Sequence, residues 1–257
     1  MPGRLGFAAC IALVLSGCDI PETPLAPQPR QLLVHAALDA GSSRQVITIE
    51  WSDESPMNPG PTAAITVTGP FGEVYGAAVE ASPNNRQVYV ITQMLVLPSE
   101  EYTLRVELGP TAVTGTTTIP HATPARCCAV SALAFSRSRD TLRLSWPRVP
   151  GAKAYHVSIQ NEFVEAGEPV TYGTYYSTFA DTSIALAGTL KTLDQGAAFT
   201  AGAIVTVLVS AVDDNFYTYY HAQVDPFAGA PASRLTGGLG VFGSLVPIVY
   251  RRLGVQP

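Results

Sequence analysis

Apolar and polar residues alternate with a period of two over most of the chain between residues 31 and 212. The alternation is clearest in Val46–Trp51 and Tyr102–Leu108, where apolar side chains fall on one face and polar side chains on the other. This period is typical of half-buried β-strands, and the first half of the chain has no long helical period. Similar short runs predict the other strands: Leu32–Leu38, Ala64–Thr68, Val88–Met94, Ala112–Ile119, Ala129–Phe135, Thr141–Trp146, Ala154–Gln160, Thr171–Phe179, Ser183–Ala187 and Ile204–Val212.

Turn-forming residues separate these runs and indicate the fold class. Glycine, proline and asparagine fill the gaps, as at Pro83–Asn85 and Gly109–Pro110. Many short strands with such turns predict an all-β fold of two β-sandwich domains of the immunoglobulin or fibronectin III type. We expect these domains at residues 31–120 and 129–257, with a linker at 121–128 and a C-terminal extension in the second domain.

The C-terminal part departs from a plain sandwich. Residues 213–215, Asp-Asp-Asn, precede an aromatic run and predict a capped short helix. Leu245–Arg251 predicts a final strand, which Pro247 would confine to a sheet edge because proline has no N–H to donate. The glycine-rich segment 237–243 is expected to dock this strand against the second sandwich. The apolar residues that would make the contact are Leu239, Val241 and Phe242.

The N-terminus has the layout of a secretory signal. One positive residue, Arg4, precedes an apolar stretch, Leu5–Leu15, and small residues follow it. A membrane-spanning helix needs about 20 apolar residues, and this stretch is too short for that. We therefore expect residues 1–17 to be a cleaved signal peptide, and the proline-rich segment 18–30 to be an extended tether.

Residues 15–18, Leu-Ser-Gly-Cys, resemble the lipobox of bacterial lipoproteins. The resemblance implies that Cys18 becomes the first residue of the mature protein and carries a thioether-linked lipid. Two or three acyl chains on one cysteine give durable attachment, because each buried methylene contributes about 0.8 kcal/mol. The expected location is the cell envelope as an outer-membrane lipoprotein, facing either the periplasm or the medium. The alternative is an ordinary secretory signal followed by a chance cysteine.

The chain resembles a family of uncharacterised envelope lipoproteins of Bacteroidetes-type bacteria, a domain of unknown function often encoded beside TonB-dependent receptors. Besides the lipobox, the similar pieces are Thr116–Pro120, Phe199–Gly202, the Asp-Asp-Asn-Phe-Tyr stretch and the Gly-Gly-Leu-Gly-Val-Phe-Gly segment at 237–243. Arg234-Leu235 departs from the asparagine-isoleucine pair expected before those glycines. The resemblance implies a location and an architecture, and it implies no chemistry.

Two sequence stretches resemble fibronectin type III domains. Leu142–Ile159 is similar to strands B and C, which implies that Trp146 fills the core of the second domain with Tyr155 beside it. In the first domain, Leu97–Tyr102 is similar to the tyrosine corner of such sandwiches. Tyr102 as an ordinary strand residue is an equally good interpretation.

Charge and motif spacing exclude several function classes. The net charge is −5, and the 15 Lys and Arg residues are scattered, so no basic stripe predicts a nucleic-acid partner. Residues 238–243 match the letters of a dinucleotide fingerprint, but the chain ends before the required acidic residue. There is no Gly-x-Ser-x-Gly elbow. The four histidines lack metal-site spacing. They are His35, His121, His156 and His221. We expect no catalytic, cofactor or metal site.

Two short clusters allow more than one interpretation. Residues 213–215 could bind calcium with Asp225, but helix capping needs fewer assumptions. Cys127 and Cys128 could form a vicinal disulfide in an oxidising compartment. Packing as two small apolar residues is favoured, because neighbouring side chains in a strand point to opposite faces.

Aromatic residues are the remaining functional signal. Two groups exceed what one sandwich face can bury and could form a recognition surface, although packing in the core and rim is the alternative. The candidate recognition residues are Tyr172, Tyr175, Tyr176, Tyr217, Tyr219 and Tyr220. The sequence thus favours a lipid-anchored envelope protein that acts by binding, as an accessory to an outer-membrane receptor. The alternatives are a glycan-active envelope enzyme, which would need a facing pair of acids, and a structural or adhesive module, favoured if the aromatics are buried.

Overall fold

A computed structural model describes most of the chain after residue 29. The described residues are 30–53, 55, 57, 60–80, 86–125, 132–165, 168–192, 195–224 and 232–257, with only the backbone for 163–165 and 168–175. The expected signal peptide, Cys18, the tether up to residue 29, Cys127, Cys128 and Asp225 lie outside the described residues.

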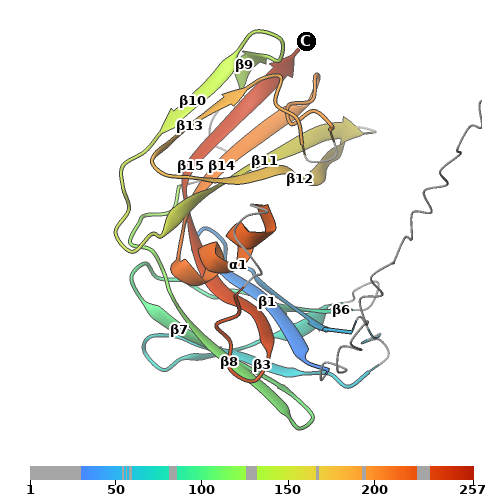
Figure 1. Ribbon diagram of the computed structural model, residues 1–257, viewed down its shortest axis with the longest axis vertical. Coiled ribbons are helices and arrows are strands. Elements are labelled where there is room, and N and C mark those ends of the chain that lie inside the picture. The colour runs from blue at the N-terminus through green and yellow to red at the C-terminus, as the bar shows by residue number, and fades with distance from the viewer. Residues whose placement is uncertain are drawn as a thin grey trace, which may run out of the picture.

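The described chain is all-β with one short helix, which confirms the predicted fold class. It forms two lobes, one above the other in Figure 1, with helix α1 between them. The strands of the first lobe are β1 (Leu32–Asp39), β2 (Gln45–Trp51), β3 (Ala64–Thr68), β4 (Val74–Gly76), β5 (Ala78–Glu80), β6 (Arg86–Ile91), β7 (Glu101–Leu108) and β8 (Thr111–Thr118). The remaining elements are β9 (Leu133–Ser136), β10 (Thr141–Ser145), β11 (Ala154–Glu165), β12 (Glu168–Ala180), β13 (Ser183–Ala187), β14 (Ile204–Val212), α1 (Asp214–Val224) and β15 (Leu239–Gln256).

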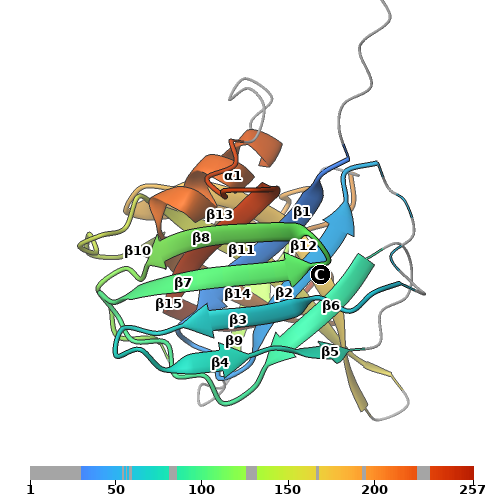
Figure 2. The ribbon, with the colours of Figure 1, turned by 90° about the horizontal axis from the view of Figure 1, so that it is seen from below.

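Three sheets build the two lobes. In the first lobe, a four-stranded sheet in the order β4-β3-β7-β8 packs over β1, β2, β6 and β5, and Figure 2 shows these two layers. In the second lobe, the two-stranded sheet β10-β13 shares one hydrophobic core with strands β9, β11, β12, β14 and the second part of β15. The larger layers of both lobes belong to one nine-stranded sheet, in the order β12-β11-β14-β15-β1-β2-β6-β5, with β9 also paired to β15.

Strand β15 joins the lobes. Its first part, Leu239–Leu245, runs parallel to β1 in the first lobe, and its second part, Leu245–Gly254, runs antiparallel to β14 in the second. Phe242 lies in the core of the first lobe and Leu253 in the core of the second. The prediction that the glycine-rich segment docks against the second sandwich is therefore wrong, because this segment pairs with β1 in the first.

Pro247 lies inside the nine-stranded sheet, so its predicted place in an edge strand is also wrong. The sheet tolerates the missing N–H because the register between β14 and β15 shifts there, pairing Val209 with Val249 but Ser210 with Pro247. Such an irregularity is a bulge, the one interior place where proline does not break a ladder bond. The Pro247 carbonyl accepts a hydrogen bond from the Ala125 N–H at 2.7 Å, which attaches the connection between the lobes to this point.

The glycines of the 237–243 segment are steric requirements. Gly237 and Gly240 have φ angles of +83° and +108°, a region that residues with a side chain rarely adopt. A Cβ on Gly243 would lie 2.7 Å from the backbone nitrogen of Phe216, so helix α1 packs directly on the strand. The interpretation of this segment as architecture holds, although its partner is β1 and not the second sandwich.

The expected core aromatics occupy both lobes. Trp146 is buried and packs on Tyr155, with ring centroids 5.5 Å apart. The Tyr102 hydroxyl accepts a hydrogen bond from the Leu97 N–H at 2.8 Å, five residues upstream, which is the contact that defines a tyrosine corner. The corner interpretation of Tyr102 is therefore confirmed. The Tyr155 hydroxyl makes a similar contact with the Val149 N–H at 2.6 Å.

Candidate functional site

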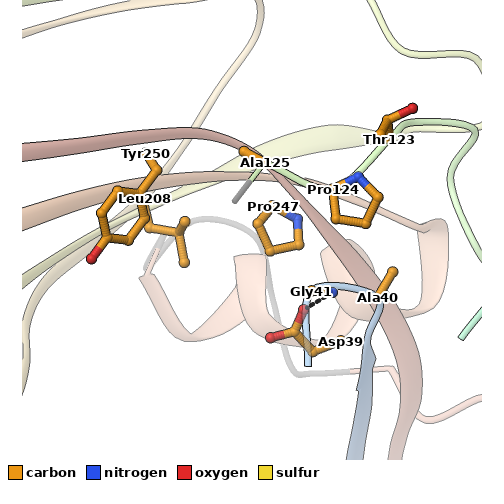
Figure 3. Close-up of a pocket in the computed structure, with 9 residues that line it drawn as sticks. All are labelled: Asp39, Ala40, Gly41, Thr123, Pro124, Ala125, Leu208, Pro247 and Tyr250. Atoms are coloured by element: carbon orange, nitrogen blue, oxygen red, sulfur yellow. Dashed lines mark hydrogen bonds between the residues drawn. The ribbon is translucent and has the colours of Figure 1, made fainter. Parts of the chain in front are cut away.

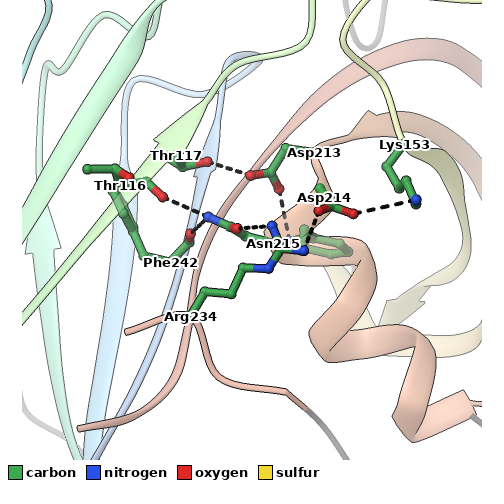
Figure 4. Close-up of polar contacts among 9 residues, drawn as sticks. Thr116, Thr117, Lys153, Asp213, Asp214, Asn215, Arg234 and Phe242 are labelled. Atoms are coloured by element: carbon green, nitrogen blue, oxygen red, sulfur yellow. Dashed lines mark hydrogen bonds and ion pairs between the residues drawn. The ribbon is translucent and has the colours of Figure 1, made fainter. Parts of the chain in front are cut away.

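The predicted helix cap lies at a seam between the lobes. Asp213 caps α1, because its Oδ1 accepts a hydrogen bond from the Phe216 N–H at 2.9 Å. The same oxygen accepts from the Ser244 N–H of β15 at 3.0 Å, and Oδ2 accepts from the Thr117 hydroxyl of β8 at 2.7 Å. One buried carboxylate thus fastens the helix to both sheets of the first lobe (Figure 4).

Asn215 extends this seam along the open edge of β15. Its Nδ2 donates to the carbonyls of Thr116 and Phe242, at 2.7 and 2.9 Å. These carbonyls would otherwise be unpaired groups on strand edges, which favour association with other chains. Asp214 points the other way, to Arg234 and to Lys153, whose Nζ lies 3.7 Å from Oδ1 (Figure 4).

The capping interpretation of residues 213–215 is confirmed. Each described hydrogen-bond partner of the Asp213 carboxylate is an N–H or O–H donor, which is the environment of a helix cap. Asp225, the fourth residue considered for calcium, lies outside the described residues. Within the described part of the chain, no group of three or more His, Cys, Asp or Glu side chains could hold a metal ion.

The helix aromatics gather on the sheets beneath α1. Phe216 packs against His156 of β11, with ring centroids 5.5 Å apart, and Tyr217 packs edge-on against Phe179 of β12 at 5.2 Å. Tyr219 is buried, with a relative exposure of 7%, and lies edge-on to His35 of β1. These rings therefore join the helix to both lobes.

The six candidate recognition tyrosines do not form one exposed patch among the described side chains. Tyr217 and Tyr220 are half-buried in α1, and Tyr176 is half-buried against the core of the second lobe. The side chains of Tyr172 and Tyr175 lie outside the described residues. The described tyrosines of this set therefore serve mainly in packing.

Two histidines lie under or beside helix α1, where burial favours the neutral form of the imidazole. Burial lowers the pKa of His156 to about 4, and its Nε2 lies within hydrogen-bond distance of the Ser177 hydroxyl. Burial also lowers the pKa of His35, although Glu50, whose Oε1 lies 3.6 Å from the His35 Nε2, acts in the opposite direction. Sequence spacing placed these histidines far apart and gave no sign that both approach α1.

A hollow of about 500 Å³ lies where the two lobes meet, and we refer to it as the junction hollow (Figure 3). Clefts between lobes are common places for ligand binding. The residues that line it are Asp39, Ala40, Gly41, Thr123, Pro124, Ala125, Leu208, Pro247 and Tyr250. Its walls therefore combine the end of β1, the connection between the lobes, and strands β14 and β15.

A second hollow of about 360 Å³, the helix hollow, lies between α1 and the outer face of β1 and β2. Its lining residues are His35, Ala36, Ala37, Asp39, Ser42, Arg44, Gln45, Val46, Thr48 and Tyr220. Arg44, its cationic residue, donates a hydrogen bond to Glu80 at 2.5 Å. Asp39 lines both hollows and connects them.

Asp39 is the charged residue that the fold places at the centre of this surface. Its Oδ1 accepts a hydrogen bond from the Gly41 N–H at 2.7 Å, and its backbone is held by the Gln45 side chain. Burial raises the pKa of Asp39, while the bond from Gly41 lowers it to a smaller extent. Sequence analysis missed Asp39, since a single aspartate before a turn matches no functional motif.

No described helix is long and apolar enough to cross a bilayer. A model of one protein family, described as "Domain of unknown function (DUF4249)", matches residues 18–245. No curated protein matches the sequence.

Several solved structures are similar at low scores. They include the IG1+IG2 domains of DIP-gamma (8% identity, TM-score 0.23, 84% of this chain and 97% of that chain) and domains A168–A170 of titin (13%, 0.23, 85% and 66%). A pullulanase from Anoxybacillus sp. LM18-11 has 10% identity and a TM-score of 0.24. The match covers 68% of this chain and only 24% of the pullulanase. These TM-scores are too low to support an argument about function.

Proposed function

This chain belongs to the DUF4249 family of unknown function, and on that premise we propose that it is a lipid-anchored binding protein of the cell envelope, an accessory to an outer-membrane receptor. The observation that carries the binding role is the junction hollow, which residues from both lobes line together. A cavity at such a boundary, with mostly apolar walls and few polar groups, is the usual form of a binding site.

The anchoring part of the proposal is supported by the N-terminal sequence. The lipobox-like residues 15–18 follow a short apolar stretch, and the family match begins at residue 18, the cysteine itself. The proline-rich segment after Cys18 is a suitable extended spacer. Beyond it, β1 runs from Leu32 to Asp39, so the first lobe adjoins the tether and the junction hollow lies at the far end of β1.

The lining of the hollows favours binding over glycan hydrolysis. Acid/base hydrolysis of glycosides uses two facing carboxyl groups about 5 to 9.5 Å apart. Among the described residues that line each hollow, the one carboxylic acid is Asp39. The structural or adhesive alternative draws support from the packed helix aromatics, since Tyr219 is buried. Recognition is therefore proposed at the hollow and not at the aromatics.

Palmitate labelling tests the anchor. Cells expressing the wild-type chain are expected to incorporate labelled palmitate and to retain the protein in the membrane fraction. Cys18→Ala should abolish both, whereas the matched control Cys127→Ala should abolish neither. Label in the Cys18→Ala variant would refute the lipid anchor.

Co-purification tests the accessory role. The tagged protein is solubilised from native membranes, and we expect an outer-membrane receptor to elute with it in stoichiometric amount. Ala125→Leu, which narrows the junction hollow, should reduce this recovery, while Asp181→Asn in the second lobe should not. Equal recovery with both variants would show that the hollow plays no part in receptor binding.

A further inference from the structure

The junction hollow contains one charged side chain among its described lining residues, the carboxylate of Asp39. Its Oδ1 is occupied by the Gly41 N–H at 2.7 Å. No described residue donates a hydrogen bond to Oδ2, and no described cation forms an ion pair with Asp39. Figure 3 shows the carboxylate beside the ring of Pro247, with one oxygen bonded to Gly41 and the other turned away from it.

The surroundings of this carboxylate favour the binding of a positively charged group. Burial raises the pKa of Asp39, because the ionised group loses water there. A cation brought to the free oxygen would replace part of the lost hydration, and charge-assisted hydrogen bonds are about twice as strong as neutral ones. The missing partner of the site is therefore a positively charged group.

Among the described residues that line the two hollows, no cationic group is available to Asp39. Arg44 lines the adjoining helix hollow, but its guanidinium bonds to Glu80. His35 lies on the same face of β1, and burial lowers its pKa, which favours the neutral form near pH 7. The phenols of Tyr220 and Tyr250, which also line the hollows, carry no positive charge in either protonation state. None of these groups neutralises Asp39.

The geometry favours an ammonium group on an aliphatic stem. A guanidinium prefers to engage both oxygens of a carboxylate, and here one oxygen is already used by Gly41. An ammonium is a point charge that one oxygen can satisfy. Most of the remaining wall is apolar and suits the methylene chain behind the ammonium, since lysine stems pack along apolar surface. These walls are formed by Pro124, Ala125, Leu208 and Pro247.

We propose that the junction hollow binds a lysine side chain presented by a protein partner, with the ammonium on Asp39 Oδ2 and the stem against the apolar walls. This inference rests on the proposed binding function and names its chemistry. The hollow is bordered by two surface turns, residues 39–41 and 123–125, so a loop of another protein can reach it. The acidic net charge of −5 also favours a basic partner.

The test follows the Gly41 amide by NMR, because its N–H is bonded to Asp39 and reports directly on that carboxylate. The mature chain, residues 18–257, is titrated with n-butylammonium, n-butylguanidinium and n-butanol. We expect a saturable shift with n-butylammonium, a weaker one with n-butylguanidinium and none with n-butanol. No shift with n-butylammonium, or an equal shift with n-butanol, overturns the proposal.

Variants separate the roles of charge and space. Asp39→Asn keeps an oxygen for the Gly41 N–H, and it should weaken n-butylammonium binding by about tenfold or more, as the loss of a hydrogen bond to a charged group does. Ala125→Leu keeps the carboxylate and should weaken binding by filling the hollow. Asp181→Asn, an exposed acid of the second lobe, should bind as the wild type does. Unchanged binding by Asp39→Asn contradicts the assignment.

A second arm decides whether the ammonium comes from a protein. The peptides acetyl-Gly-Gly-Lys-Gly-Gly-amide and its norleucine counterpart are titrated in the same way. Binding of the lysine peptide at least as tight as that of n-butylammonium, without binding of the norleucine peptide, supports a partner side chain. Failure of the lysine peptide refutes it in favour of a small free amine. Because these titrations need no lipid and no receptor, they can fail while the palmitate and co-purification tests succeed.

Discussion

The Oδ2 of Asp213 accepts a hydrogen bond from the hydroxyl of Thr117 at 2.7 Å, across 96 residues of sequence. Thr117 lies in the edge strand β8 of one sheet, and Asp213 directly precedes the helix α1, which packs on the other sheet. The same carboxylate accepts a hydrogen bond from the Ser244 N–H and caps α1. A single side chain therefore joins three elements that meet only in the folded protein.

Removing this carboxylate should destabilise the fold. Asp213→Ala loses the helix cap and leaves buried donors without an acceptor, so we expect a loss of about 2 to 4 kcal/mol. Chemical denaturation measures it. The neighbouring Asp214→Ala removes only exposed ion pairs, worth about 0 to 1 kcal/mol, and is the control. Equal effects of the two substitutions would contradict the role given to Asp213.

Two glycines of β15 should respond differently to the same substitution. A Cβ on Gly243 would meet the backbone of Phe216 at 2.7 Å, and a helix backbone cannot yield as a side chain can. Gly243→Ala should therefore cost about 1 to 3 kcal/mol, as overpacking does. Gly254→Ala places its Cβ no closer than 3.9 Å to any atom outside its chain neighbours and should be nearly neutral. Thermal melting followed by near-ultraviolet circular dichroism compares the pair.

The shared strand changes what a core substitution in the second lobe should do. Trp146→Ala removes a buried aromatic ring and should cost about 3 to 5 kcal/mol. Two separate sandwich domains, as the sequence predicts, would melt in two independent transitions, and the first domain would be unaffected. Because β15 contributes to both cores, we now expect the first lobe to melt together with the second. Calorimetry distinguishes the outcomes, and an unchanged transition of the first lobe would show that β15 does not couple them.

His156 should make stability fall in acid. Its folded pKa of about 4 lies below the unfolded value of 6.5, so the unfolded chain binds the extra proton first. The contribution is complete above pH 6.5 and is lost as the pH falls toward 4, by about 3 kcal/mol. Unfolding by urea at several pH values measures this slope. His156→Gln should flatten it, and the difference between variants removes the smaller contribution of His35, which has the same direction.

Much of the fold could be predicted because strand periodicity is local. Ala64–Thr68, Ser183–Ala187 and Ile204–Val212 agree with the predicted ranges residue for residue. The short strands β4 and β5 were missed, since three residues cannot display an alternation. The predicted strand 129–135 can be compared only from Ala132 onward, where β9 begins at Leu133.

The candidate site could not be predicted for a different reason. Asp39 acquires its environment from Pro247 and Ala125, which are distant in sequence. Pro247 reaches it through the path of β15, and the Ala125 N–H is bonded to the Pro247 carbonyl. The path of β15 could not be predicted because Pro247 indicated an edge strand. The bulge in the β14–β15 register accommodates this proline inside the sheet. The local alternation of apolar and polar residues indicates which residues form strands. Which distant strands pair with one another depends on tertiary contacts.

The parallel pairing of β1 with β15 also sets an order of events during synthesis. Leu33 pairs with Leu239, so the sheet of the first lobe lacks a strand until the last part of the chain has been made. Domains usually fold one after another from the N-terminus, but here neither lobe can complete its sheet before β15 has been made. We therefore expect both lobes to complete their folding only after β15 has been made, in one late, slow step dominated by distant contacts.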